Sequence, residues 1–220
     1  MPHTIRVWDL PTRLFHWSLA TTTVALVVTA KLGGNAMEWH MRLGYAMLAL
    51  LAFRIVWGLV GGRWSRFASF ACTPARLWRY LRGEGDGAVD SVGHTPLGAL
   101  AVCTMLAALL LQVASGLTSD DEIAFAGPLA RLVSGDTVGL ASWYHKEVGQ
   151  YLLYVLVALH VLAILFYALI RKRALIGPML HGDKRLPMPA PSSRDDARSL
   201  VGAAAVLAAC GVMAWWLSNL

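Results

Sequence analysis

Long apolar runs alternate with short polar segments along the whole 220-residue chain. A helix that crosses the hydrocarbon layer of a membrane needs roughly 20 mainly apolar residues, and five runs have about this length. We interpret them as helices, because a strand of a membrane barrel would alternate polar and apolar positions. The pattern therefore predicts an all-α integral membrane bundle, with a core of four helices and a fifth, C-terminal transmembrane helix. The five predicted spans are Leu14–Leu32, Met41–Gly61, Pro96–Leu117, Glu147–Ile170 and Leu200–Leu217.

Composition and segment boundaries support this class. Hydrophobic residues make up 57% of the chain and charged residues only 15%, which is far more apolar than a typical soluble domain. The polar linker Pro187–Arg198 separates the last span from the others, so we predict one domain over residues 1–185 and a linker with an additional transmembrane helix over residues 186–220. The first run follows Asp9 and Pro11 and is a full span, which favours a retained helix over a cleaved signal peptide.

Lys and Arg residues are distributed unevenly between the predicted loops. They gather before the first span, after the second span, and between the fourth and fifth spans. The positive-inside rule assigns these segments to the cytoplasm, so the N-terminus is cytoplasmic and the C-terminus periplasmic. The acidic segment Ser119–Glu122 lies on the opposite, outer side. This topology explains the net charge of +6, and a nucleic-acid partner is not needed to account for it.

The three cysteines do not form a recognisable motif. Cys72, Cys103 and Cys210 are far apart and form no Cys-x-x-Cys or Cys-x-x-Cys-His pattern. This spacing excludes both covalent c-type haem attachment and a thiol redox motif.

Four of the seven histidines lie within or at the ends of the predicted spans: His16, His40, His145 and His160. The topology puts His16 and His160 near the cytoplasmic side, and His40 and His145 near the outer side. The fifteen residues from His145 to His160 rise about 22 Å and turn about 1500°, so the two side chains point to broadly the same side of one helix. Neighbouring helices then supply a facing partner at each level, which pairs His16 with His160 and His40 with His145.

Two stacked, six-coordinate haems would require such an arrangement. A polar or ionisable side chain inside a membrane is costly and indicates a functional site, and coordination to iron satisfies an imidazole nitrogen. Occupied axial positions favour electron transfer over oxygen activation. Hydrogen-bonded histidines or a proton relay are the alternative, but the first four spans contain no deeply placed Asp or Glu to complete a relay.

Three further residues are candidate cofactor contacts. Arg54 lies near the predicted level of the inner histidines, where its guanidinium would either bind a haem propionate or extend to the cytoplasmic headgroups. Arg42, beside an outer histidine, would serve a propionate or anchor the helix at the interface. His94 precedes Thr95–Pro96, which has the residues of a helix start. We assign His94 to this start, with a quinone or propionate contact as the more specific alternative.

Four segments resemble the bacterial cytochrome b561 family, including the related cytochrome b subunits of hydrogenases. They are VWDLPTRLFHW, WHMRLGYAMLALLAFRIVWG, GHTPLGAL and HKEVGQYLLYVLVALHVLAILFY, within roughly residues 5–185. The resemblance implies a four-helix core with two b-type haems ligated from the first, second and fourth helices, quinone chemistry, and a redox partner. It matches the ligands to His16, His40, His145 and His160. The fifth helix departs from the four-helix version of the family.

We therefore expect a di-haem cytochrome b of the bacterial inner membrane. Its expected function is electron transfer between the quinone pool and a periplasmic redox partner such as a c-type cytochrome. The protein would act there either as an electron carrier or as a quinone-linked oxidoreductase. One alternative is a superoxide:quinone oxidoreductase, and another is the membrane-anchor cytochrome b subunit of a hydrogenase-like complex. A non-redox membrane protein is the third. Lipid is a partner in every case, and oligomeric assembly stays open.

Overall fold

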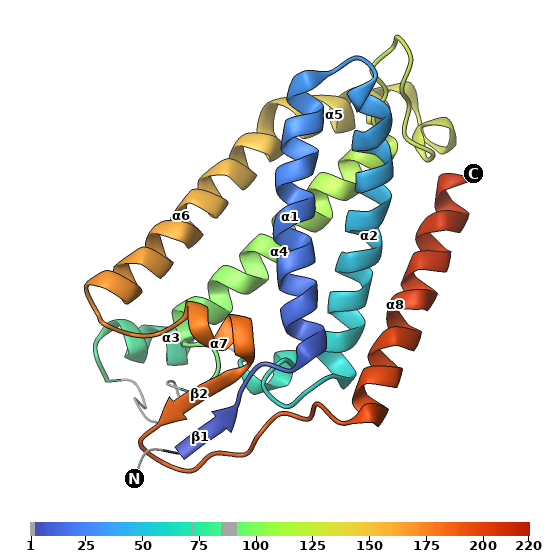
Figure 1. Ribbon diagram of the computed structural model, residues 1–220. Coiled ribbons are helices and arrows are strands. Elements are labelled where there is room, and N and C mark those ends of the chain that lie inside the picture. The colour runs from blue at the N-terminus through green and yellow to red at the C-terminus, as the bar shows by residue number, and fades with distance from the viewer. Residues whose placement is uncertain (1–2, 72, 85–91) are drawn as a thin grey trace. The chain divides into compact units, whose positions relative to one another are not determined.

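The chain is mostly helical in the computed structural model, which describes residues 3–71, 73–84 and 92–220. Cys72 lies outside these described residues, whereas Cys103 and Cys210 are free thiols. Figure 1 shows the helices in chain order. The five longest are α1 (Leu10–Leu32), α2 (Ala36–Val60), α4 (Pro96–Thr118), α6 (Gln150–Leu169) and α8 (Ala197–Ser218).

Four helical stretches of the described chain are long and apolar enough to cross a membrane. They are α2, α4, α8 and a continuous stretch, Gly135–Leu169, in which α5 (Gly135–Trp143) leads through a π-helical segment into α6. Helix α1 has 23 residues, but it includes His16, Ser18 and the threonines Thr21–Thr23, which lower its hydropathy. An integral membrane protein with mostly helical structure is thus confirmed, while the number of five crossings stays a prediction.

A small two-stranded sheet was not anticipated by the all-α prediction. Strand β1 (His3–Arg6) pairs antiparallel with β2 (Asp183–Leu186), with His3 opposite Leu186 and Arg6 opposite Asp183 (Figure 1). Each strand has only four residues, and its partner is at the other end of the sequence. Such a pairing leaves no periodic pattern that sequence analysis can detect.

Contacts divide the chain into two compact units, each made of several separate segments. Unit 1 contains Met1–Phe15, Arg54–Thr104 and Leu159–Ala205, and unit 2 contains His16–Phe53, Met105–Ala158 and Val206–Leu220. The domains predicted from sequence, 1–185 and 186–220, follow the linear order instead, and that division stays a prediction.

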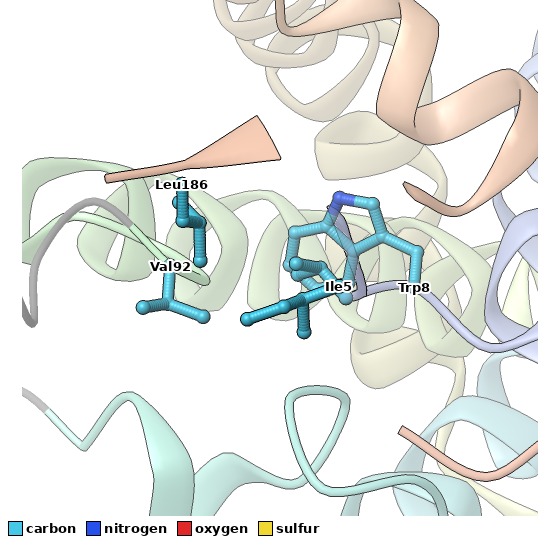
Figure 2. Packing of buried hydrophobic residues seen from close by; sticks show 5 residues of the cluster. Ile5, Trp8, Val92 and Leu186 are labelled. Carbon is cyan, nitrogen blue, oxygen red and sulfur yellow. The ribbon is translucent and has the colours of Figure 1, made fainter. Parts of the chain in front are cut away.

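The core of unit 1 forms around the sheet. Ile5, Val7, Trp8, Val92 and Leu186 are buried together, and Figure 2 shows four of them converging beside β2. The unit also contains three short helical elements that connect the longer ones. They are a 3-10 turn, Phe67–Ser69, and the helices α3 (Pro74–Leu81) and α7 (Ile176–His181).

The polar linker before α8 is fixed to the N-terminal segment of unit 1. The backbone N–H of Ser193 donates to Arg6 O at 2.7 Å, and its hydroxyl donates to Val7 O at 2.8 Å. Asp195 accepts from the Arg6 guanidinium at 2.6 Å and from the backbone N–H of Leu10 at 2.7 Å. These bonds hold the linker in one path along the unit.

The core of unit 2 joins four helices. Met47 and Leu51 of α2 and Leu109 of α4 are almost fully buried, as expected where the apolar faces of a bundle meet. The partly buried side chains around them come from α1, α4 and α6: Leu19, Leu26, Leu106, Leu110, Val113 and Leu153. This packing fixes the relative positions of the residues on these helices within unit 2.

Candidate functional site

Unit 2 brings His40 of α2 together with His145. Their ring centroids lie 6.2 Å apart, and the ring planes are nearly perpendicular at 86°. A metal–imidazole bond is about 2.0–2.1 Å. With about 1.1 Å from each nitrogen to its ring centre, two imidazoles on opposite sides of one ion place their centroids about 6.3 Å apart. The observed separation is therefore one that His40 and His145 would have if they held one metal centre between them.

Hydrogen bonds fix the tautomer of both rings. His40 Nδ1 lies 3.0 Å from Leu26 O, and His145 Nδ1 lies 2.9 Å from Gln112 O. A carbonyl oxygen can only accept, so Nδ1 carries the proton in each ring and Nε2 keeps its lone pair. Metal-binding histidines are commonly oriented in this way. Both Nε2 atoms are thus available as metal ligands.

His145 lies in a π-helical segment, Tyr144–Gly149, between α5 and α6. Such segments contain one extra residue per turn and are frequent at functional sites. The span predicted from Glu147 onward therefore begins earlier than expected, since the helix is continuous from Gly135. The apolar pattern of the sequence does not predict the π-helical segment, because such a segment is defined by which backbone groups bond to each other and not by the positions of apolar residues.

The two histidines predicted to lie near the cytoplasmic side belong to different units. His16 lies on α1 in unit 2, where its ring is 5.1 Å from that of Trp17 at an angle of 89°. His160 lies on α6 in unit 1 and is half-buried. Their pairing with each other stays a prediction.

Arg54 of α2 is buried in unit 1, with 4% of its surface exposed. Its guanidinium carbon lies 4.7 Å from the ring centre of Phe67 and 6.0 Å from that of Phe15. Its Nη1 is closed off from solvent and has no hydrogen-bond partner among the described residues. Burial among aromatic rings argues against extension to the headgroups, and it leaves a cation with an unused donor.

Asp9, which sequence analysis did not single out, is the nearest buried carboxylate in the same unit. It has no exposed surface, and each of its two oxygens accepts two hydrogen bonds. The donors are Thr12 N at 2.8 Å, Trp57 Nε1 at 3.3 Å, Gly62 N at 3.1 Å and Ser65 Oγ at 2.8 Å. A carboxylate has about four acceptor positions, so Asp9 balances the charge of Arg54 at longer range without binding it. An Asp before Leu-Pro is typical of a helix N-cap, so this pattern is the signal in the sequence that could have identified Asp9.

His94 packs beside this region in unit 1. Its ring centre lies 4.7 Å from that of Trp8 and 4.5 Å from that of Phe70, and its Nδ1 is closed off from solvent without a partner among the described residues. Burial, followed by the positive charges of Arg54 and Lys184, lowers the pKa of His94 to about 3. The imidazole is therefore neutral at physiological pH.

The predicted start of the third span is confirmed. Helix α4 begins at Pro96, and the hydroxyl of Thr95 accepts from the backbone N–H of Gly98 at 3.1 Å. This is the capping bond expected of a threonine in front of a proline at the first helical position.

Arg42 has a partner on its own helix. Its guanidinium forms an ion pair with Glu38 at 2.5 Å and lies 5.2 Å from the ring centre of Trp39. Both members of the ion pair are exposed, so the contact is weak. A role for Arg42 at a propionate stays a prediction.

The acidic segment Ser119–Glu122 borders an open pocket of about 550 Å³ in unit 2. Asp121 accepts hydrogen bonds from the backbone N–H groups of Ile123, Ala124 and Phe125, and these bonds lower its pKa. Four carboxylates contribute to the lining of the pocket, beside glycine, apolar and hydroxyl residues. Its charged side chains are Asp120, Asp121, Glu122, Lys146 and Glu147.

A haem fits the His40 and His145 pair better than a bare metal ion does. No group of three or more His, Cys, Asp or Glu side chains that could hold an ion occurs among the described residues. A haem brings four nitrogen ligands of its own, so two protein imidazoles complete its coordination. The two Nε2 lone pairs and the ring separation meet that requirement.

Apolar helices of spanning length and facing imidazoles are the features of a membrane cytochrome b. A family model described as prokaryotic cytochrome b561 matches residues 7–182, and the chain belongs to this family. The resemblance found in the sequence is thereby confirmed. The protein is a membrane-bound b-type cytochrome that functions in electron transfer, and haem b is its cofactor.

Curated relatives carry the name of a hydrogenase component. The Probable Ni/Fe-hydrogenase B-type cytochrome subunit of Azotobacter vinelandii is 24% identical over 211 residues, covering 81% of this chain and 87% of the relative. The protein of the same name from Bradyrhizobium diazoefficiens is 22% identical over 232 residues, covering 83% and 86%. No solved structure matches the chain.

Proposed function

We propose that the protein carries electrons across the bacterial inner membrane, between the quinone pool and a periplasmic redox partner such as a c-type cytochrome. In this proposal the chain binds two haems b, through His40 with His145 and through His16 with His160. The observation that carries the proposal is the 6.2 Å separation of the His40 and His145 rings, which matches the spacing expected across one ion. The N-terminus is cytoplasmic and the C-terminus periplasmic.

Haem b supplies, when bound, an iron centre that takes up and releases one electron at a time. The contribution of the chain is ligation, orientation and exclusion of other chemistry. Two imidazoles on one iron leave no open position for oxygen, which favours electron transfer over oxygen activation. Leu26 O and Gln112 O hold the Nδ1 protons and so keep both Nε2 atoms available.

Arg54 and His94 support a carboxylate-binding site in unit 1. Each has a nitrogen that is closed off from solvent and lacks a partner among the described residues, and a buried donor without an acceptor is costly. Asp9 is saturated by its own four donors. Because Arg54 carries a full charge, we assign a propionate carboxylate to this site in preference to a neutral quinone carbonyl.

A second candidate function is that of a membrane-anchoring cytochrome b subunit in a hydrogenase-like oxidoreductase complex. The names of the relatives from Azotobacter and Bradyrhizobium favour it. In both candidates the carboxylates around Asp120 and Glu147 give the outer side a charge that attracts a basic partner surface.

A reduction experiment tests the proposal and separates the two candidates. A ubiquinol analogue is mixed with the purified, oxidised protein while the visible haem bands are followed, and a c-type cytochrome is then added. The leading proposal predicts haem reduction by the quinol and onward transfer to the c-type cytochrome by this chain alone. The second candidate is supported if the quinol reduces the haem but electrons reach the c-type cytochrome only after hydrogenase subunits are supplied. Haem that is reduced by dithionite but not by quinol contradicts both.

A further inference from the structure

Helix α4 supplies none of the predicted iron ligands, yet it holds one of them at two points. We infer that Gln112 of α4 is a positioning residue that sets the orientation and basicity of His145, and thereby the redox potential of the iron that His145 ligates. The inference rests on the proposed function, in which His145 is an axial ligand. All of the residues that carry it belong to unit 2.

Gln112 contacts His145 through both its backbone and its side chain. The backbone O of Gln112 accepts from His145 Nδ1 at 2.9 Å, and the side-chain Nε2 donates to the backbone O of His145 at 3.0 Å. The first bond fixes the rotation of the ring, and the second fixes the backbone from which the ring projects. A single residue on a neighbouring helix thus restrains both ends of the His145 side chain.

One end of this contact lies in the π-helical segment. His145 O lies within Tyr144–Gly149, where the helical hydrogen bonds are shifted by one residue, and the Gln112 amide adds a donor there. A side chain at position 149 would collide with Gln112 Oε1 and would come within 2.9 Å of the Tyr144 ring. Gly149 therefore leaves the space that the Gln112 amide occupies.

The side-chain amide of Gln112 keeps its position although its oxygen lacks a hydrogen-bond donor among the described residues. Gln112 Oε1 is closed off from solvent and has no partner among the described residues. A buried acceptor without a donor is unfavourable, so the Nε2 bond and the packing outweigh this cost. A polar side chain kept inside a membrane under these conditions indicates a functional role.

The backbone of α4 also limits how far the ring can tilt. A Cβ atom at Gly116 would lie 2.8 Å from His145 Cε1 and 3.2 Å from Nδ1, so the ring packs directly against the helix. Ser115 Oγ lies 3.3 Å from Nδ1 and donates to Gln112 O at 2.9 Å. Gln112, Ser115 and Gly116 together form the surface on which His145 rests.

This surface affects the chemistry of a bound iron. A hydrogen bond from Nδ1–H to a carbonyl makes the imidazole a stronger electron donor through Nε2. A stronger donor stabilises the oxidised iron and lowers its reduction potential, since hydrogen bonds to axial ligands tune haem potentials. Loosening the Gln112 contact is therefore expected to raise the potential of the outer haem alone.

The test is a potentiometric titration of the full-length protein carrying Gln112→Met, which keeps the side-chain size and the backbone carbonyl but removes the amide donor to His145 O. Without that donor the backbone of His145 is less restrained, so the bond from Nδ1 to Gln112 O should loosen. We expect one of two redox components to move to higher potential while the other stays in place. We also expect the affinity of the shifted site for haem to fall by about 10–100-fold, the usual effect of removing a group that orients a metal ligand. Gly116→Ala, which pushes on the ring, should move the same component.

Thr118→Ala is the matched control, because the Thr118 hydroxyl donates to carbonyls of α4 itself, at Ala114 and Ser115. It should leave both potentials unchanged. If Gln112→Met fails to fold, Gly116→Ala decides the question alone. Unchanged potentials in these variants, or equal shifts of both components, would overturn the inference. A wild-type protein that binds no haem would instead overturn the proposed function, so the two failures are distinguishable.

Discussion

The interior of unit 1 contains three polar side chains whose charges and partners bear on ligand binding: Asp9, Arg54 and His94. Asp9 is fully buried and saturated with donors, whereas Arg54 retains a cation without a direct acceptor among the described residues. The nearby positive charge of Arg54 is one reason why His94 stays neutral, although burial is the larger cause. The guanidinium of Arg54 therefore has an unused donor in the interior of unit 1, and such a donor is suited to a carboxylate ligand.

The lowered pKa of His94 predicts a pH-dependent stability. The folded protein has a pKa of about 3 at this residue, whereas the unfolded chain has the ordinary value of about 6.5. As the pH falls below about 6.5, only the unfolded chain takes up the proton, so the free energy of unfolding falls by up to about 1.4 kcal/mol per pH unit.

Thermal unfolding in detergent between pH 7.5 and 5 measures this effect, with His94→Gln as the comparison. The variant should lose less stability on acidification than the wild type. Asp183 does not interfere in this range, because the hydrogen bond from Arg6 lowers its pKa and keeps it ionised. Identical pH slopes for the two proteins would count against a neutral His94.

At the scale of elements, the apolar runs predicted the long helices well. The predicted spans Pro96–Leu117 and Leu200–Leu217 agree to within three residues at each end with α4 (Pro96–Thr118) and α8 (Ala197–Ser218). Residues that face lipid or a helical core must be apolar over a full span, so their pattern is visible in the sequence. The pairing of β1 with β2 was missed, because it joins opposite ends of the chain.

The same contrast applies to the candidate site. The levels of His40 and His145 followed from topology and helix geometry, and the structure brings these two residues together. Asp9 and Gln112 were not identified, because their importance comes from donors and acceptors on other segments. The pairing of His16 with His160 stays a prediction, as do the roles of Arg42, Arg54 and His94.

The π segment yields a prediction at this scale. Deleting Val148, which follows His145 within Tyr144–Gly149, should restore α-helical hydrogen bonding and rotate His145 by about 100° relative to α6. The ring would then face away from His40, so one haem should be lost and the other kept. Haem content per purified chain is the measurement. Deletion of Glu122 in the acidic loop is the control, and equal haem loss in both deletions would contradict the prediction.

At the scale of the whole molecule, composition, helices and family agree on a membrane cytochrome b. The family match covers residues 7–182, which ends shortly before the polar linker and α8. The part of the chain that follows the match contains the polar linker and α8, a helix long and apolar enough to cross a membrane. The histidines on α1, α2 and α6 and in the π segment all fall inside the matched region.

The central claim is that four histidines hold two haems b in one chain. Pyridine haemochrome quantification on purified protein, with oxidised and dithionite-reduced spectra, measures it most directly. The account predicts two haems b per chain, both low-spin, and one remaining haem in His145→Ala and in His40→Ala when the variants are folded. A single haem in the wild type, or loss of both haems in a folded single variant, would contradict it.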